Sequence, residues 1–462
     1  MITGEIKNKI DSIWDDFFSA GMSEYLTVIE QFSYLMFIHS LDEVENETEQ
    51  YEMIKRNKNY TNLAKGYLFP EIAKRRKAFQ AQHPEAKIIS LGIGNTTEPL
   101  APHIVEEMKN FVEALGTKEG YEGYQDDSAG MPKLRERISK AIYNGEIKPS
   151  EIFVSDGAKC DLGRLQAMFG ADVNVAVQDP SYPVYVDGTV MAGAGGKEPV
   201  TENGFKDITY MPCLPENGFF PDLSVVKKDS LIYICSPNNP TGAVATKENL
   251  FELVNFAKAN GCVVLFDAAY SAFIRDENLP KSIYEIEGAK DCAIEMQSFS
   301  KPAGFTGVRL GWCVVPENLK FDDGSKIADA WARITNTAFN GASNIAQAGG
   351  FAALDETGLK EMQETISYYL ENAALIRSAL ESENFKVMGV EVYSGGNAPY
   401  VWAKFPGKKS WDVFDQILSQ CNVVVTPGAG FGPSGESFIR FSSFGHRENI
   451  QEACERLKLF KM

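Results

Sequence analysis

Between Ile152 and Asn344, short apolar runs alternate with longer amphipathic stretches. The runs have the length of strands, and the stretches between them have the period of helices. Polar residues follow most runs directly, as expected where the carboxyl ends of parallel strands form one edge of a sheet. The pattern predicts an α/β domain whose sheet is largely parallel and whose functional residues lie at that edge. The predicted strands are 152–154, 173–177, 231–235, 263–266, 293–296 and 312–315.

The pattern differs on both sides of this domain. After Asn344 a long predicted helix precedes short strands, and two further helices complete what we expect to be a smaller α+β domain. We therefore predict an N-terminal arm that also contributes to the small domain (53–105), a large domain (106–345) and a small domain (346–462). The other predicted helices are 71–82, 104–114, 131–143 and 359–383. The other predicted strands are 88–91, 387–393, 400–404, 423–425 and 438–441.

Residues 1–52 form a separate unit in the sequence. They contain 12 acidic residues and 2 lysines, so more than half of the chain's net charge of −18 lies in this segment. Gly21 separates two predicted helices. Their apolar positions are Ile6, Ile10, Ile13, Phe17 and Phe18 in the first, and Leu26, Ile29, Phe32, Leu35 and Met36 in the second.

Composition narrows the class of protein. A pI near 4.9 disfavours nucleic acid and anionic membranes as partners. The eight cysteines include no CxxC pair, which is typical of reduced thiols in a cytoplasmic protein. The four histidines do not cluster, so no metal site is predicted. The most apolar segment, 26–41, is too short and too polar to span a bilayer.

The stretch QSFSKPAGFTGVRL at 297–310 has the residues that hold pyridoxal 5′-phosphate. Lys301 can bind the cofactor covalently, and Ser298, Ser300 and Arg309 offer hydroxyls and a planar guanidinium to its phosphate. Asp267, at the end of an apolar run, is the candidate partner of the pyridinium nitrogen. Each residue alone would more often lie on the surface, but their common order favours a cofactor site.

Four further motifs fit the same site. SDGAK begins a helix, whose free N–H groups at Ala158 and Lys159 can bind phosphate, although such a turn is often only a helix cap. Tyr182 in DPSYPVY can stack on a cofactor ring, or it can be an ordinary core aromatic. Asn239 in SPNNPTG can donate to a ring oxygen, or it can belong to a plain turn. Tyr270 in FDAAY lies three residues after Asp267.

With these motifs in this order, residues 53–462 resemble the fold-type-I pyridoxal-phosphate aminotransferases, which have a seven-stranded, largely parallel sheet. The resemblance implies that Lys301 also moves the proton in catalysis, that Asp267 keeps the ring nitrogen protonated, and that Asn239 and Tyr270 bind the ring oxygen. It further implies that Tyr124 reaches the phosphate of a neighbouring subunit in a homodimer. The implied substrate-binding residues are Tyr67, Gly94, Lys159, Tyr182, Asn239, Asn344 and Arg440.

GYLFPEI, SLGIGNTTEPL and FNGASNIAQ are similar to those members that aminate tetrahydrodipicolinate with L-glutamate to give LL-diaminopimelate. One position departs from that pattern: a glutamate that meets the distal ammonium is replaced by the stretch Gln125–Ser128, where Asp126 or Asp127 could do the same work. The alternatives are a related aminotransferase for aspartate, alanine or aromatic amino acids and a transcription regulator with this fold. A regulator would need a basic N-terminal domain, whereas this one is acidic.

The N-terminal segment has a resemblance of its own. EYLTVIEQFSYLMFIHSLDEVENE resembles the helical start of modification subunits in type I restriction systems. The resemblance covers residues 1–52, and no methyltransferase motif follows it. It therefore implies a fused helical extension that could dock to a partner, and no methyltransferase activity.

Overall fold

The computed structural model describes residues 4–21, 29–40, 54–63, 68–92, 94–125 and 128–462. The chain divides into two compact units, Met1–Lys58 and Asn59–Met462. The fold-type-I architecture predicted for the larger unit is confirmed by a mixed α/β body with a large, mostly parallel sheet.

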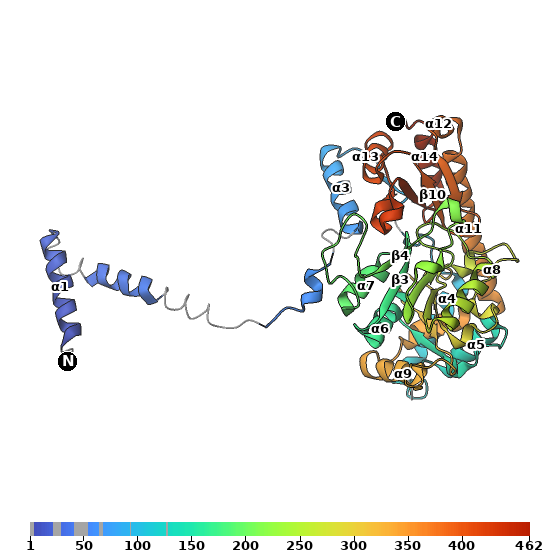
Figure 1. The fold of residues 1–462 in the computed structure, drawn as a ribbon, viewed down its shortest axis with the longest axis horizontal. Coiled ribbons are helices and arrows are strands. Elements are labelled where there is room, and N and C mark those ends of the chain that lie inside the picture. Colours follow the sequence, from blue (N-terminus) through green and yellow to red (C-terminus); the bar gives the residue numbers. More distant parts are fainter. Residues whose placement is uncertain (1–3, 22–28, 41–53, 64–67, 93, 126–127) are drawn as a thin grey trace. The chain divides into compact units, whose positions relative to one another are not determined.

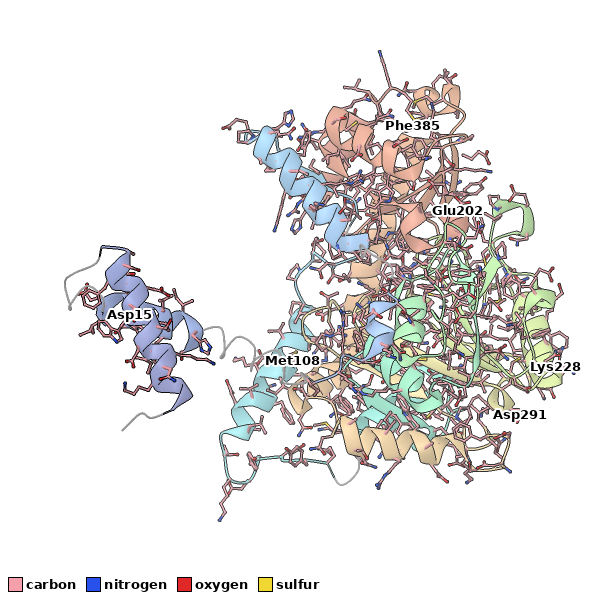
Figure 2. All side chains as sticks on the ribbon, turned by 60° about the vertical axis from the view of Figure 1, so that its left-hand side comes forward. Asp15, Met108, Glu202, Lys228, Asp291 and Phe385 are labelled. Carbon is pink, nitrogen blue, oxygen red and sulfur yellow. The ribbon has the colours of Figure 1, made fainter. Side chains whose placement is uncertain are left out.

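The first unit is helical, as predicted from its apolar periodicity. Helix α1 (Glu5–Ser19) ends before Gly21, whose φ of +85° lies in the left-handed region that glycine adopts easily. Residues 29–40 form the second helix, whereas Leu26 lies outside the described residues. Figure 2 draws the side chains of these helices, with Asp15 labelled on α1. Several of their large apolar residues, Ile29, Leu35 and Met36 among them, are exposed.

The main sheet of the second unit has the strand order β2-β8-β7-β6-β5-β3-β4. Strand β8 runs antiparallel to both of its neighbours, and the other pairs are parallel. The sequence prediction missed β4, a four-residue edge strand that ends in a proline. The strands are β2 (Ile152–Ser155), β3 (Asn174–Asp179), β4 (Thr209–Pro212), β5 (Ser230–Cys235), β6 (Val263–Asp267), β7 (Ala293–Ser298) and β8 (Gly311–Val314).

Helices cover both faces of this sheet (Figure 1). Alternate residues of a strand point to opposite faces, so Tyr233 and Leu265 pack with α6, α7 and α9, whereas Ile232 and Phe266 pack with α8. The near-continuous apolar strands are therefore explained by burial on both sides. The helices are α6 (Ala158–Phe169), α7 (Val184–Ala192), α8 (Lys247–Ala259) and α9 (Ile327–Ala338), with α4 (Pro102–Leu115), α5 (Pro132–Tyr143) and α10 (Asn344–Ala353) in a further cluster.

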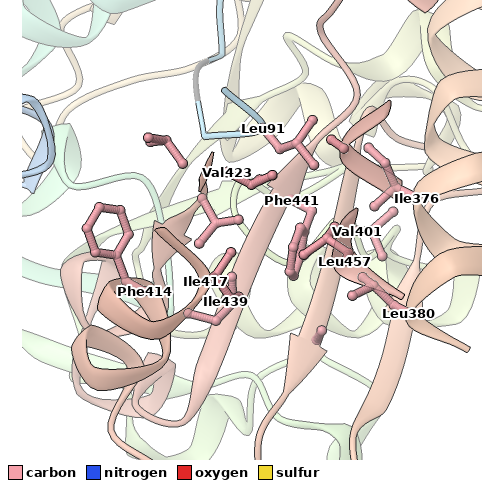
Figure 3. Packing of buried hydrophobic residues seen from close by; sticks show 14 of the residues in the cluster. Leu91, Ile376, Leu380, Val401, Phe414, Ile417, Val423, Ile439, Phe441 and Leu457 are labelled. Carbon is pink, nitrogen blue, oxygen red and sulfur yellow. The ribbon is translucent and has the colours of Figure 1, made fainter. Parts of the chain in front are cut away.

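A smaller antiparallel sheet has the order β12-β13-β10-β9, and β1 pairs in parallel with β11 beside it. Figure 3 shows its core, where Phe414, Ile439 and Phe441 pack together. The elements of this region are α3 (Leu68–Gln82), β1 (Ile89–Ser90), α11 (Glu356–Leu380), α12 (Glu383–Val387), β9 (Glu391–Ser394), β10 (Tyr400–Lys404), α13 (Ser410–Cys421), β11 (Val423–Val424), β12 (Thr426–Pro427), β13 (Phe438–Ser442) and α14 (Arg447–Leu457).

The strand predicted at 387–393 is wrong at its start. Val387 ends the short helix α12, and the strand β9 begins only at Glu391. The helical turn places Phe385 in the core against the rings of Phe405 and Phe460, which is a tertiary contact that the local pattern does not contain.

Candidate functional site

A cavity of about 820 Å³ lies at the carboxyl ends of β5, β6 and β7. Ligands of open α/β sheets bind at this edge, because the loops that leave the strands can aim side chains into a common space. The structure brings most of the predicted site residues together here. The cavity is lined by Gly94, Ala158, Lys159, Tyr182, Asn239, Asp267, Tyr270, Ser298, Ser300, Lys301, Arg309 and Arg440.

Asp267 is the last residue of β6 and is buried. Burial raises the pKa of its carboxyl group, and hydrogen bonds from Tyr185 and from the N–H of Ala269 act against that rise. The Tyr185 hydroxyl donates to Oδ2 over 2.8 Å, and the Ala269 N–H donates to Oδ1 over 3.1 Å. Tyr185 itself stacks on Tyr233, with 5.1 Å between the ring centroids. The carboxylate is therefore fixed in direction and suited to a cationic ring nitrogen.

Lys301 follows β7 after a short turn and points into the cavity. Its Nζ donates to the carbonyl oxygen of Gly94 and lies 5.2 Å from the centroid of the Phe444 ring. Burial, together with the positive charges of Arg440, Arg309 and Lys159, lowers the pKa of Lys301 to about 7. A large fraction of this amine is therefore neutral near neutral pH, which a nucleophilic lysine requires.

The start of α6 and Arg309 together form an anion cradle. Gly157 precedes the helix with a φ of +117°, and a Cβ at this position would lie 2.4 Å from an Arg309 guanidinium nitrogen. Arg309 donates to the Ser300 hydroxyl over 3.2 Å, and the Ser298 hydroxyl accepts from the Ser300 N–H over 3.0 Å. Helix N–H groups, two hydroxyls and a guanidinium thus converge, which fits a phosphate group.

Arg440, on β13, is almost completely buried. Its guanidinium donates to Asn239 Oδ1 and to the carbonyl oxygen of Gly92, each over 2.7 Å, and it lies 4.5 Å from the centroid of the Tyr400 ring. Among the described residues, its Nε has no hydrogen-bond partner. A buried cation with a donor to spare is suited to a carboxylate ligand.

Two contacts that involve tyrosines complete the wall of the cavity. The hydroxyls of Tyr270 and Tyr400 are hydrogen-bonded over 2.8 Å. The ammonium nitrogen of Lys159 lies 5.5 Å from the centroid of the Tyr182 ring, which is buried enough that the pKa of its hydroxyl is raised. Tyr182 and Tyr270 therefore present ring surface and a polar edge to any planar ligand.

Two predicted positions, Tyr124 and Asn344, do not line the cavity. The Tyr124 side chain is 85% exposed, and Asn344 at the start of α10 donates to the Gly123 carbonyl oxygen over 3.0 Å. Tyr67 lies outside the described residues, as do Asp126 and Asp127.

The sequence reasoning also missed residues that line or organise the cavity. Tyr185 stood in the DPSYPVY motif and could have been noticed there. Tyr400 and Arg76 carried no local signal, because they reach the cavity through the tertiary structure. Gly92 stood in the stretch SLGIGNTTEPL and Ile72 in GYLFPEI, where they could have been noticed.

Within the described ranges, no group of three or more His, Cys, Asp or Glu residues is arranged to hold a metal ion. In that same part of the chain no helix has both the length and the apolar character needed to cross a membrane.

Two family models match the chain. The model for aminotransferase class I and II matches residues 86–457, and the model for the HsdM N-terminal domain matches residues 6–88. The resemblance expected for residues 1–52 is thus confirmed, but its match is longer than expected and includes α3.

Similar proteins cover nearly the whole second unit. LL-diaminopimelate aminotransferase from Protochlamydia amoebophila is 51% identical over 88% of this chain and 97% of its own length. The chloroplastic enzyme of Arabidopsis thaliana is 52% identical over 88% of this chain and 87% of its own length. The solved structure of L,L-diaminopimelate aminotransferase from Chlamydomonas reinhardtii has a TM-score of 0.83 and 53% identity, and the match covers 88% of this chain and 99% of that one.

Proposed function

Because the chain belongs to the class I and II aminotransferase family, we infer that it transfers the amino group of L-glutamate to tetrahydrodipicolinate, giving LL-diaminopimelate and 2-oxoglutarate. One observation carries this inference. Lys301, Asp267, Arg309 and Arg440 line a single cavity in a chain that matches 97% of an LL-diaminopimelate aminotransferase at 51% identity. The product is a precursor of lysine and of the cell wall, and we place the reaction in the cytoplasm.

The residues present fit pyridoxal 5′-phosphate as the cofactor. In the anion cradle the start of α6 lies close to the Arg309 guanidinium, since a Cβ at Gly157 would lie 2.4 Å from one of its nitrogens. The buried Asp267 needs a cationic partner such as a pyridinium nitrogen. Ser298, Ser300, Ala158 and Lys159 would share the phosphate, Tyr182 would stack on the ring, and Asn239 and Tyr270 would bind its oxygen. When bound, the cofactor supplies an electron sink for the charge that develops at the substrate α-carbon.

The chain's own residues position the substrate and move its proton. Arg440 holds the α-carboxylate by its planar guanidinium, which directs the α-hydrogen of the amino donor toward the lysine. Lys301 Nζ takes and returns the proton at the α-carbon, which its lowered pKa of about 7 allows near neutral pH. Asp267, held by Tyr185, keeps a negative charge opposite the ring nitrogen. Gly94, Lys159, Asn344 and Tyr67 are the proposed contacts to the remainder of the substrate.

We propose that the active unit is a homodimer. Tyr124 and Tyr121 are 85% and 70% exposed in a single chain, although large aromatic side chains usually find cover. Val105 and Val112 on the neighbouring α4 are also exposed. A second copy seated on this surface would cover these residues and bring Tyr124 to the phosphate of its neighbour.

A coupled assay of the purified protein with LL-diaminopimelate and 2-oxoglutarate tests this function. We expect glutamate formation that depends on both substrates, with a much higher kcat/KM for LL-diaminopimelate than for aspartate, alanine or phenylalanine. A higher kcat/KM for one of these amino acids would assign the chain to a related aminotransferase. Loss of the dimer on gel filtration at assay concentrations, with activity retained, would remove Tyr124 from the site.

A further inference from the structure

A buried hydrogen-bond chain lies directly behind the anion cradle. Ser155 is the last residue of β2, Asp161 is in the first turn of α6, and both side chains are buried. The Ser155 hydroxyl donates to Asp161 Oδ2 over 2.5 Å and accepts from the Gly157 N–H over 3.2 Å. The Ser155 hydroxyl therefore connects a buried carboxylate to the backbone of the cradle.

Asp161, at one end of these hydrogen bonds, is held in place by Arg164. Arg164, one turn further along α6, places its guanidinium nitrogens 3.4 Å from Asp161 Oδ1 and 2.8 Å from Asp156 Oδ1. Its guanidinium carbon lies 3.9 Å from the centroid of the Phe339 ring, at the end of α9. Burial raises the pKa of Asp161 to about 7, and Ser155 and Arg164 oppose the rise. Asp161 is thus held by two donors in a place where an unpaired carboxylate would be costly.

At the other end of these hydrogen bonds, the backbone of Gly157 is fixed. Its N–H is used by Ser155, and its carbonyl oxygen accepts from the N–H groups of Cys160 and Asp161 over 2.9 and 3.3 Å. Both backbone polar groups of this residue are therefore hydrogen-bonded within the protein. Its Cα, without a side chain, faces the Arg309 guanidinium. Any rotation of the Gly157 peptide would turn the first N–H groups of α6 and disturb the contact with Arg309.

We propose that Ser155 and Asp161 are positioning residues for the cofactor phosphate, because together they set the direction of the Gly157 backbone. The inference depends on the proposed function only in taking pyridoxal phosphate as the ligand of the cradle. Removing the Ser155 hydroxyl leaves the Gly157 N–H buried without an acceptor, and the loop then turns to find one.

The test compares two probes that differ only in the phosphate. Apoprotein is titrated at pH 8 with pyridoxal 5′-phosphate and with pyridoxal, and binding is followed by absorbance. We expect Ser155→Ala to weaken pyridoxal phosphate binding by about tenfold, the effect of leaving one buried polar group unpaired. Pyridoxal binding should be unchanged. Asp161→Asn keeps an acceptor oxygen without the charge, so the loss should be smaller, about threefold.

A matched control separates positioning from stability. Ser410 is also fully buried and its hydroxyl accepts a backbone N–H, that of Ala429, over 3.2 Å, but it lies in the small antiparallel-sheet region. Ser410→Ala should lower the unfolding temperature as Ser155→Ala does, with unchanged affinity for both probes. The double variant Ser155→Ala/Asp161→Asn should bind pyridoxal phosphate no more weakly than Ser155→Ala alone.

The inference is overturned if Ser155→Ala or Asp161→Asn binds pyridoxal phosphate with wild-type affinity, if a variant loses affinity for both probes equally, or if the two substitutions add. Should Ser155→Ala fail to fold, Asp161→Asn with both probes is sufficient. A wild-type protein that does not bind pyridoxal phosphate at all would overturn the proposed function as well, so the two failures are distinguishable.

Discussion

The two units of the chain treat apolar and polar residues in opposite ways. In the first unit, large apolar side chains such as Met36 and Phe37 are more than 60% exposed. In the second unit, Asp267, Asn239 and Arg440 are less than a tenth exposed although they are polar or charged. A helical period is enough to form the first unit's helices, but two short helices do not build a core. Buried polar groups, by contrast, persist only where distant segments supply partners.

The largest effect is expected from removing the Lys301 amine, which points into the cavity. Lys301→Ala should lower amino transfer by at least about 10³-fold, because we propose this lysine as both the covalent ligand of the cofactor and the proton carrier. The far-ultraviolet circular dichroism should stay that of the wild type. The yellow absorbance of lysine-bound cofactor should disappear. Turnover near the wild-type rate would exclude Lys301 from catalysis.

Two phenylalanines, one in each unit, allow the stability effects of a buried and an exposed ring to be compared. Phe414→Ala should cost about 3–5 kcal/mol in the free energy of unfolding of the second unit, because its ring is fully buried (Figure 3). Phe37→Ala should change stability by less than about 0.5 kcal/mol, since that side chain is 61% exposed. Chemical denaturation of both variants measures the difference. A comparable loss for Phe37→Ala would show that the first unit is covered in the assembled protein.

Arg440→Lys tests whether the buried guanidinium grips a carboxylate by its shape. An ammonium keeps the charge but cannot make two parallel hydrogen bonds. We therefore expect kcat/KM for diaminopimelate to decrease, by an amount that corresponds to a loss of about 1.5–3 kcal/mol in transition-state binding. Arg377→Lys is the control, because Arg377 pairs with Glu381 at the surface. It should leave kcat/KM within about twofold. An unchanged kcat/KM for Arg440→Lys would refute the carboxylate clamp.

The lowered pKa of Lys301 predicts a pH dependence. Only the neutral amine captures the cofactor, so the rate of pyridoxal phosphate capture by apoprotein should fall about tenfold per pH unit below about 7 and level off above it. The free energy of unfolding of the apoprotein should also rise with pH because of this group. Between pH about 7 and 10.4 the lysine binds more protons in the unfolded protein than in the folded protein. Stopped-flow absorbance measures the rate. A midpoint near 10 would contradict the desolvated environment.

The smallest effect is expected from deleting the first unit's helices. A protein that begins at Met53 lacks both helices and keeps every residue that lines the cavity. The proposed dimer should persist, and cofactor content and turnover should stay within a few-fold of the full chain. A truncated protein that is monomeric, or that no longer retains pyridoxal phosphate, would show that residues 1–52 belong to the active assembly.

Most local elements and the residue types at the strand ends could be predicted from the amino-acid sequence alone. Apolar runs on the strands, flanked by amphipathic stretches, were sufficient to predict β5, β6 and β7, because strands buried on both faces must be apolar almost throughout. The placement of Asp267 and Lys301 just after such runs was enough to predict one site, since parallel strands end at a common edge.

The contacts that hold the site residues in place could be seen only in the tertiary structure. The antiparallel insertion of β8 between β2 and β7, the hydrogen bond from Tyr185 to Asp267, and the two acceptors of Arg440 join segments up to several hundred residues apart. Such contacts produce no periodic pattern in the sequence, because each residue is suited to a partner that lies far away in the chain. The same reason explains why Ser155, in the SDGAK motif, and Asp161, two residues after it, were not noticed. Ala158 and Lys159 of that motif were predicted as phosphate-binding residues, and both line the cavity.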